Sequence, residues 1–327
     1  MDDIIQKLKE INLKGRGGAN FPVGLKWELV KNAPGTKKYI ICNGAEGEPG
    51  VLKDGYILEH YPEYVIGGIK CALDLFYNSE AYIYLNKNYF YRFADKLRKL
   101  IAKLPINVVK EKGGYLAGEE TTLLESLEGD RLEPRLRPPY PTEQGLWSFP
   151  TLINNVETFY AVYLISQNKY EYKRFFTIRG EVKKRGNFEL NENLTIKEVL
   201  KETANLPVKK FFVQVGGEAS GEFLTMEEID QPLKGTAAIT VYDLEKTDKL
   251  KLLRQIAKFF LKEHCGKCLT CREGVYRLNE ILNKRKPDLN KALVISEVLK
   301  ETSFCGLGSG CGQAAYSLIT KFLNAEI

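Results

Sequence analysis

Four cysteines near the C-terminal end constrain the fold of this chain more than any other feature. Cys265, Cys268 and Cys271 form a C-x2-C-x2-C run, and Cys305 follows in a separate segment. Four thiolates are what a [4Fe–4S] cluster requires, and three from one loop with a distant fourth can supply them. The run does not continue with the x3-C-P of two-cluster ferredoxins, because Arg-Glu-Gly follows Cys271. The pattern therefore predicts one cluster held within a larger protein.

Two other interpretations compete for these cysteines. A structural zinc site also uses thiolates, but its ligands usually come as separated pairs. A disulfide framework is disfavoured because the total of seven cysteines is odd and five of them lie in the last quarter of the chain. We interpret the additional Cys311 as a small buried residue, with a minor alternative that it competes as a ligand. Zinc remains the main alternative to the cluster.

Length and composition narrow the class of protein. A chain of 327 residues has room for two or three domains, and its 44% hydrophobic and 28% charged residues are ordinary for a globular protein. No apolar run approaches the ~20 residues of a membrane helix, and the start MDDIIQKLKE is not a signal peptide. The net charge of +6 is spread over mixed Lys/Glu stretches. We expect a cytoplasmic protein without direct membrane insertion and without a nucleic-acid partner.

Residues 1–170 alternate glycine-rich turns with short apolar strands and amphipathic helices, which predicts an α/β domain with a layered sheet. The expected strands are 39–42, 81–85 and 106–109, and the expected helices are 62–75, 90–104 and 119–127. The proline-rich residues 132–150 are expected to form an extended, rigid loop.

Two further modules are expected after this domain. Residues 171–246 read as mixed strands around one helix, which predicts a β-grasp-like α+β module. Its expected strands are 175–182, 188–190, 211–215 and 238–242, and its expected helix is 195–203. Residues 247–327 repeat apolar residues at helical spacing four times, which predicts a four-helix bundle. The first three cysteines fall between its first two helices and Cys305 between its last two, so all four can meet at one end.

The first of four segments that could bind a ligand is GRGGANFPVGLKW at residues 15–27. Its glycines would let backbone N–H groups approach a phosphate closely, a following helix N-terminus adds positive potential, and Lys26 could supply a point charge. The Rossmann fingerprint G-x-G-x-x-G after a strand is absent. A flexible glycine loop without a ligand is the alternative interpretation.

The other three segments strengthen the prediction of a binding site. CNGAEGEPG at residues 42–50 directly follows a predicted strand, where ligands of open α/β sheets bind, and Asn43 offers both a donor and an acceptor. GGYLAGEET at residues 113–121 and NNVET at residues 154–158 repeat the pattern of glycines, acids and carboxamides. Any one segment could be turn chemistry, but four in one domain predict a ligand site.

Taken together, these segments resemble the NADH-binding flavoprotein subunit of respiratory complex I and its relatives in NAD-reducing hydrogenases and formate dehydrogenases. The stretches that carry the resemblance run in family order from residue 15 to residue 310: GRGGANFPVGLKW, ICNGAEGEPG, YLAGEETTLLESLEG, RLRPPYPTEQGLWSFPTLINNVETF, HCGKCLTCREG and SFCGLG. The resemblance implies a Rossmann-like FMN- and NADH-binding α/β domain, a β-grasp (ubiquitin-like) module and a C-terminal four-helix cluster domain.

The resemblance also assigns site residues. Those implied to surround FMN are Gly15, Arg16, Gly17, Lys26, Asn43, Glu46, Tyr115, Gly118, Glu119, Asn154 and Asn155. Those implied to contact NADH are Gly18, Phe21, Glu48, Glu120 and Arg137, with Tyr140 stacking on the adenine. Among them, Glu48 and Glu120 are the candidate catalytic residues, and Glu120 would favour NADH over NADPH. The cluster ligands would be Cys265, Cys268, Cys271 and Cys305.

The function that follows is an NADH:acceptor oxidoreductase (diaphorase) subunit. Hydride would pass from NADH to FMN, and single electrons would pass through one [4Fe–4S] cluster to a small thioredoxin-like [2Fe–2S] partner and further redox subunits, in either direction. Only two histidines are present, which agrees with chemistry carried by cofactors. The alternative is a non-catalytic electron-transfer or scaffold subunit with a degenerate nucleotide site. Ala45, Gly47 and Leu29 support that alternative, because they replace an acid, a serine and an aromatic residue usual in the family.

Overall fold

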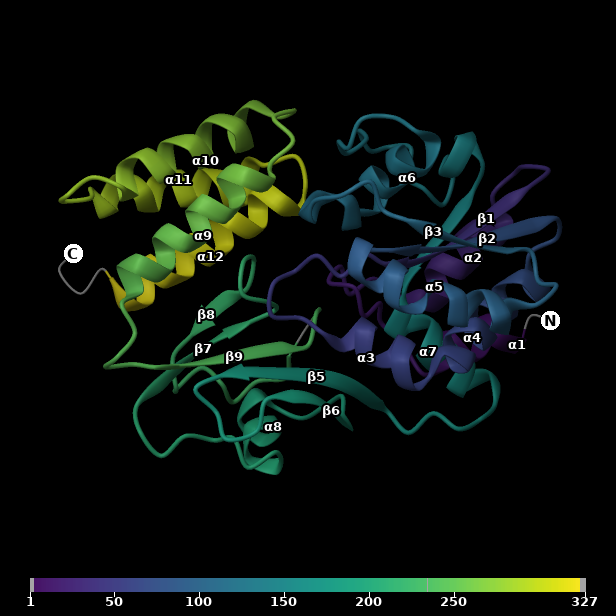
Figure 1. The fold of residues 1–327 in the computed structure, drawn as a ribbon, viewed down its shortest axis with the longest axis horizontal. Coiled ribbons are helices and arrows are strands. Elements are labelled where there is room, and N and C mark those ends of the chain that lie inside the picture. The colour runs from purple at the N-terminus through teal and green to yellow at the C-terminus, as the bar shows by residue number, and fades with distance from the viewer. Residues whose placement is uncertain (1–2, 234, 324–327) are drawn as a thin grey trace. The chain divides into compact units, whose positions relative to one another are not determined.

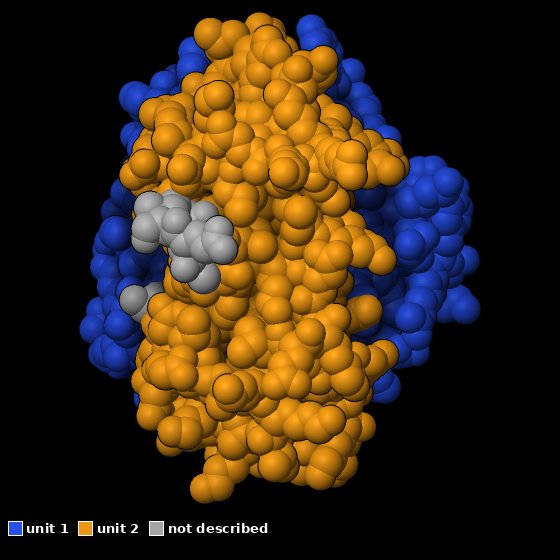
Figure 2. Space-filling model, turned by 90° about the vertical axis from the view of Figure 1, so that its left-hand side faces the viewer, with its two compact units in different colours: residues 1–47, 52–175 blue, residues 48–51, 176–327 orange. Residues whose placement is uncertain are grey.

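The computed structural model describes residues 3–233 and 235–323 (Figure 1). The chain divides into two compact units, coloured separately in Figure 2. The first unit contains residues 1–47 and 52–175, and the second contains residues 48–51 and 176–327. The short segment 48–51 therefore leaves the first unit and joins the second before the chain returns.

A four-stranded parallel sheet forms the centre of the first unit (Figure 1). Its strands are β1 (Lys38–Gly44), β2 (Ser79–Leu85), β3 (Ile106–Lys110) and β4 (Thr151–Asn155), in the order β3-β2-β1-β4. From β1 the chain builds outward on one side to β2 and β3, and then returns to the other side of β1 for β4. Such a reversal of strand order is where open α/β sheets bind their ligands, at the carboxyl ends of the strands. At that edge Asn43 of β1 is in register with Asn155 of β4.

In the described part of the first unit, seven α-helices and two short 3-10 turns accompany the sheet. They are α1 (Asp3–Glu10), α2 (Val23–Asn32), α3 (Lys53–His60), α4 (Pro62–Leu75), α5 (Lys87–Ile101), η1 (Tyr115–Gly118), α6 (Glu120–Glu128), η2 (Leu146–Ser148) and α7 (Val156–Ser166). The main core joins Ile40 of β1 and Leu152 of β4 to Ile69 of α4 and Phe159 of α7, all fully buried. Gly68 allows α4 to touch α7, because a Cβ there would lie 2.0 Å from the Phe159 carbonyl oxygen.

The second unit begins with a mixed five-stranded sheet. Its strands are β5 (Lys173–Gly180), β6 (Gly186–Asn191), β7 (Phe211–Val215), β8 (Glu222–Leu224) and β9 (Ala238–Asp243), in the order β6-β5-β9-β7-β8. β9 pairs parallel with β5 and antiparallel with β7. The single helix α8 (Ile196–Glu202) begins at a capping box between Thr195 and Glu198, and it buries Val199 and Leu200 in the core shared with the sheet.

Up to residue 323, where the described residues end, the chain forms four helices after the sheet: α9 (Lys249–Glu263), α10 (Leu269–Leu282), α11 (Leu289–Thr302) and α12 (Gly306–Phe322). α12 packs against α9 and α11, and α10 packs against α9 and α11 (Figure 1). α11 and α12 approach closely at Gly312, where a Cβ would lie 2.3 Å from the backbone nitrogen of Lys300. Fully buried Leu253, Val275 and Leu318 show that each of their helices turns an apolar face inward.

Within the described residues, no helix is long and apolar enough to span a membrane.

Candidate functional site

Three of the predicted segments meet at the carboxyl edge of the parallel sheet. The Asn43 side chain donates to the Gly118 carbonyl (Nδ2–O, 2.8 Å) and accepts from the Ala45 backbone (3.1 Å). Asn155 donates to the Asn43 carbonyl (3.3 Å). The ends of β1 and β4 and the turn η1 are therefore joined by side-chain hydrogen bonds. This edge is also the point at which the strand order reverses, so it is the candidate ligand site of the first unit.

The two carboxamides at the end of β4 both hold the protein together. Asn155 caps α7, because its Oδ1 accepts from the Glu157 backbone nitrogen (3.0 Å). Asn154, with its amide oriented so that both ends are satisfied, accepts from Trp27 Nε1 (2.8 Å) and donates to the Ile153 carbonyl (3.0 Å). The pair therefore has a structural role in addition to the ligand contacts predicted for it.

The first glycine-rich segment forms a loop that lies against this edge. The Gly15 backbone donates to the Phe21 carbonyl (2.9 Å), and Gly18 has a φ of 115° that favours glycine. A Cβ at Gly17 would lie 3.1 Å from the Cβ of Asn155. Arg16 is buried, with its guanidinium donating to the Tyr170 hydroxyl (2.9 Å). Arg16 thus anchors the loop to the body of the unit.

A group of four charged side chains lies at the start of α6. Lys26 approaches Glu120 (Nζ–Oε2, 3.4 Å) and donates to the Ile153 carbonyl (3.3 Å), while Arg137 approaches Glu120 (Nη1–Oε1, 3.1 Å) and also pairs with Glu119. The other oxygen of Glu119 caps α6 by accepting from the backbone nitrogens of residues 121 and 122. We call Lys26, Glu119, Glu120 and Arg137 the α6 charge group. Each member was predicted from the sequence to contact FMN or NADH.

Two aromatic residues predicted to contact NADH are open to solvent. Phe21 is 39% exposed and Tyr140 is 52% exposed. Lys26 Nζ lies 5.7 Å from the centroid of the Phe21 ring. Exposed aromatic faces beside charged groups are suited to stacking against a nucleotide base.

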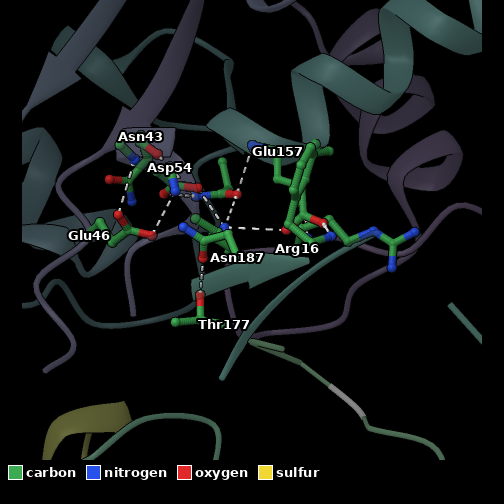
Figure 3. Close-up of polar contacts among 12 residues, drawn as sticks. Arg16, Asn43, Glu46, Asp54, Glu157, Thr177 and Asn187 are labelled. Atoms are coloured by element: carbon green, nitrogen blue, oxygen red, sulfur yellow. Dashed lines mark hydrogen bonds and ion pairs between the residues drawn. The ribbon is translucent and has the colours of Figure 1, made fainter. Parts of the chain in front are cut away.

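A buried charged group that the sequence analysis did not predict contacts Asn155 at this sheet edge; Figure 3 labels its members Glu46, Asp54 and Glu157. Lys53 Nζ contacts Asp54 (2.5 Å), Asn155 (2.9 Å) and Glu157 (3.4 Å). Glu46 accepts from the backbone nitrogens of Asp54 (2.8 Å) and residue 55 (3.2 Å). Of the charged members, only Glu46 was assigned a role in advance. The adjacent Lys-Asp pair at the start of a helix, just after GEPG, is the sequence signal that could have revealed the others.

Burial dominates the electrostatics of this group. Burial, followed by the charge of Asp54, raises the pKa of Glu46 to about 7. Burial would also raise the pKa of Glu157, but Lys53, Arg174 and Arg16 outweigh that effect and hold this pKa below its usual value. Burial would lower the pKa of Lys53, yet the carboxylates of Asp54, Glu157 and Glu46 raise it. Lys53 therefore stays protonated, and its positive charge stabilises the neighbouring buried carboxylates.

Glu48 belongs to the second unit, unlike the other residues predicted to contact a nucleotide. Its carboxylate accepts from the backbone nitrogens of Ala219 (2.8 Å) and Ser220 (3.0 Å) and from the Ser220 hydroxyl (2.7 Å). A Cβ at Gly217 would lie 2.1 Å from Glu48 Cγ, so glycine is required there. In this arrangement the Glu48 carboxylate holds segment 48–51 to the loop before β8.

The four predicted cluster ligands lie in two loops of the second unit. Cys265 follows α9, Cys268 immediately precedes α10, Cys271 lies in the first turn of α10, and Cys305 immediately precedes α12. Burial, followed by the nearby Cys268, Cys305 and Cys265, raises the pKa of Cys271 to about 12. Each of the other three thiols is thus close enough to influence Cys271 electrostatically.

The chemistry of this centre fits an iron–sulfur cluster. Within residues 3–233 and 235–323, no three His, Cys, Asp or Glu side chains converge to hold a single metal ion. A cluster makes a different demand, because each of its four thiolates binds its own iron. Two buried polar atoms beside these cysteines, His264 Nδ1 and Ser303 Oγ, have no hydrogen-bond partner among the described residues. Sulfur atoms of a cluster are acceptors that such groups could use.

Comparison with known families gives two matches along the chain. Residues 8–164 match the family described as the Nuo51 FMN-binding domain. Residues 251–325 match the family described as the NADH-ubiquinone oxidoreductase-F iron-sulfur binding region. The first match covers the glycine-rich loop, the parallel sheet and the α6 charge group, and the second covers all four cysteines.

Similar proteins align over almost the whole chain. The F subunit of the NADH-quinone oxidoreductase of Aquifex aeolicus is 34% identical, over 98% of this chain and 84% of that protein. The alpha subunit of the NAD-reducing hydrogenase HoxS of Cupriavidus necator is 31% identical, over 98% of this chain and 59% of that protein. The crystal structure of an NAD+-reducing [NiFe]-hydrogenase in the H2-reduced state superposes with a TM-score of 0.87 at 31% identity. That match covers 98% of this chain and 61% of the hydrogenase chain.

Proposed function

The chain belongs to the family of the NADH-quinone oxidoreductase F subunits, and we propose that it is the NADH-oxidising subunit of a multi-subunit redox complex. The observation that carries the proposal is that one chain contains both sites. A ligand site lies where the strand order of the parallel sheet reverses, and four neighbouring cysteines lie in the second unit. Bound FMN supplies the exchange between two-electron hydride transfer and one-electron transfer. One [4Fe–4S] cluster, which Cys265, Cys268, Cys271 and Cys305 would hold, would supply a one-electron exit for these electrons.

The residues of the first unit have distinct roles in this proposal. The backbone N–H groups of Gly17 and Gly18 and the ammonium of Lys26 would bind the FMN phosphate, because the N–H groups of Gly15 and Arg16 already donate within the protein. Asn43, held by Gly118 and Ala45, would orient the flavin edge. The remaining residues proposed around FMN are Arg16, Glu46, Tyr115, Glu119, Asn154 and Asn155. The buried side chains of Lys53 and Asp54 would hold Asn155 in place through their hydrogen bonds to it.

The nucleotide would contact Gly18, Phe21, Glu120 and Arg137, with Tyr140 on the adenine. The carboxylate of Glu120 is proposed to disfavour the 2′-phosphate of NADPH through like-charge repulsion. Lys26 and Arg137 each approach Glu120 within 3.4 Å, so part of its charge is already balanced. We therefore expect a moderate preference for NADH rather than an absolute one.

Glu48 is proposed to act on the nucleotide only after a change of partners. Its carboxylate now accepts three hydrogen bonds from Ala219 and Ser220. To contact NADH, one of its oxygens would exchange the Ser220 hydroxyl for a nucleotide hydroxyl or amide.

The second unit is proposed to combine a β-grasp module, residues 171–246, with a cluster-binding helical domain, residues 247–327, after the FMN- and NADH-binding domain of residues 1–170. Cys265, Cys268, Cys271 and Cys305 are the proposed ligands. Electrons leaving this cluster would pass to a small thioredoxin-like [2Fe–2S] subunit and further redox subunits, and we propose a cytoplasmic location.

The main alternative, a scaffold subunit with a degenerate nucleotide site, rests on Ala45, Gly47 and Leu29. Small residues at the first two positions suit close packing: a Cβ at Gly47 would lie 3.3 Å from the Tyr115 backbone, and one at Gly118 would lie 3.3 Å from the Ala45 Cβ. The substitutions thus fit a closer approach of neighbouring segments in a working site.

Purification under anaerobic conditions with added FMN separates the two functions. We expect a flavin absorption band, FMN released on heating, and NADH-dependent reduction of ferricyanide. Recovery of FAD would overturn the FMN assignment. Four irons per chain with no flavin after reconstitution would instead favour the scaffold subunit. Co-purification of a small [2Fe–2S] protein tests the proposed partner, and turnover of a quinone by this chain alone would contradict the need for one.

A further inference from the structure

Ser303 lies in the short turn between α11 and Cys305. Its backbone nitrogen donates to the Leu299 carbonyl (3.2 Å), so the residue ends α11 as its C-cap. Its hydroxyl oxygen is shielded from solvent and has no hydrogen-bond partner among the described residues. The turn therefore places a buried donor within two residues of a proposed cluster ligand.

Gly308 locates this hydroxyl relative to Cys271. A Cβ at Gly308 would lie 2.4 Å from Ser303 Oγ and 3.1 Å from Cys271 Cβ. The two side chains thus flank the same point in the first turn of α12. Cys271 is 6% exposed, so this point belongs to the interior of the helical domain. The Ser303 hydroxyl is beside the proposed ligand Cys271 rather than on the outer surface.

Other buried serines of the same helical domain have acceptors within the protein. Ser296, on the same helix α11, donates to the Ala292 carbonyl (2.7 Å). Ser317 of α12 donates to the Ala314 carbonyl (3.2 Å) and accepts from the Phe223 backbone (3.0 Å). A buried hydroxyl without an acceptor is unfavourable, and native proteins rarely tolerate it. The unsatisfied Ser303 hydroxyl therefore indicates an acceptor that is not part of the polypeptide.

We propose that the Ser303 hydroxyl donates a hydrogen bond to a sulfur at the Cys271 corner of the [4Fe–4S] cluster and raises its reduction potential. The inference rests on the proposed cluster. Reduction adds one electron to the cluster and breaks no bond, so the reduced form carries more negative charge on its sulfurs. A donor therefore stabilises the reduced form more than the oxidised form, and hydrogen bonds to the sulfurs are one of the factors that set cluster potentials.

The test compares Ser303→Ala with Ser296→Ala in the complete chain carrying its cofactors. Both variants remove one buried hydroxyl at α11, but only the first removes the proposed donor. Iron content is measured first, and the midpoint potential then follows from an EPR-monitored redox titration. In Ser303→Ala we expect about a tenfold less favourable reduction equilibrium, which for one electron equals about 59 mV toward negative potential. Ser296→Ala should keep the wild-type potential.

A second measurement looks for the proton itself. Pulsed ENDOR of the reduced cluster after exchange into D2O should detect one coupled deuteron that disappears in Ser303→Ala and persists in Ser296→Ala. An unchanged potential at four irons per chain, or equal shifts in both variants, would overturn the inference. Loss of iron in Ser303→Ala would also overturn it, because the residue would then be structural. Absence of iron from the wild-type protein would refute the proposed cluster instead.

Discussion

Replacing Lys53 by Met should destabilise the first unit strongly. Lys53 Nζ contacts Asp54 (2.5 Å), Asn155 (2.9 Å) and Glu157 (3.4 Å), and both Lys53 and its two acidic partners are about 2% exposed. Methionine fills a similar volume but leaves the carboxylates of Glu46, Asp54 and Glu157 without their central cation. Removing one partner of a buried ion pair costs about 3–5 kcal/mol.

The change in melting temperature that this loss of stability causes depends on the size of the unit. For a domain of 150–250 residues, 1 kcal/mol lowers the Tm by about 2–4 °C, so Lys53→Met should lower it by about 6–20 °C. Tryptophan fluorescence is a suitable assay, because the only two tryptophans of the chain, Trp27 and Trp147, both belong to the first unit. Flavin is held at one saturating concentration, since bound ligand raises the apparent stability.

Lys37→Met is the matched control. Lys37 pairs with Glu80 at 2.8 Å in the same unit, but their side chains are 31% and 27% exposed. Such pairs contribute about 0–1 kcal/mol. If Lys53→Met lowers the Tm no further than Lys37→Met, the reasoning about the buried group is wrong.

The pH dependence of the stability of Lys53→Met is a second test of the role of the buried charged residues. The pKa of Glu46 is raised to about 7 in the folded protein, from an ordinary value of 4.5. The folded state therefore holds this proton more tightly, and the contribution of Glu46 to stability is full below pH 4.5 and lost as pH rises through 7. Without Lys53 the pKa should rise further, so Lys53→Met should gain stability on acidification over a wider range than the wild type. A variant with an unchanged pH profile would contradict this.

Three further predictions concern the proposed sites. Cys305→Ser should hold fewer than four irons per chain in an iron assay, whereas Cys311→Ser should keep four. The reverse result would make Cys311, and not Cys305, the fourth ligand. Glu120→Gln should raise the ratio of kcat/KM for NADPH to that for NADH by about tenfold, since Lys26 and Arg137 already balance part of the charge; an unchanged ratio would remove Glu120 from nucleotide selection. Gly217→Ala should destabilise the second unit by about 1–3 kcal/mol, because residue 217 has a φ of 132° and the new Cβ would overlap the Glu48 side chain. An unaltered thermal unfolding curve would refute this close approach.

Elements with a strong local signal were predicted well. α4 and β7 occur at the expected residues, 62–75 and 211–215, because a proline starts the helix and an apolar β-rich run makes the strand. β4 was not predicted as a strand. It is a five-residue segment after a proline-rich loop, and it is a strand because β1 offers an unpaired edge in the folded sheet. The loop expected over residues 132–150 contains only the short turn η2.

In the candidate site, too, some features were predictable from the sequence and others were not. Residue types and spacing predicted an iron–sulfur cluster from the cysteine run and a ligand site from the glycine-rich segments, and the resemblance to a known family implied that the ligand is FMN. The family matches agree with both cofactors. Most of each motif is local, because a loop must present its backbone N–H groups or thiols within a few residues of one another; Cys305, which comes from a separate segment, is the exception. The individual contacts proposed for these residues stay predictions.

Only the tertiary structure decided the environment of these residues. Glu46, Lys53 and Glu157 come from three different segments, and the pKa of Glu46 depends on how completely long-range packing removes them from water. Ser303 meets Cys271 only because the end of α11 and the first turn of α10 both pack against Gly308 of α12. Residue type and spacing determine which chemistry is available, whereas burial and pairing between distant segments set the strength and direction of each electrostatic effect.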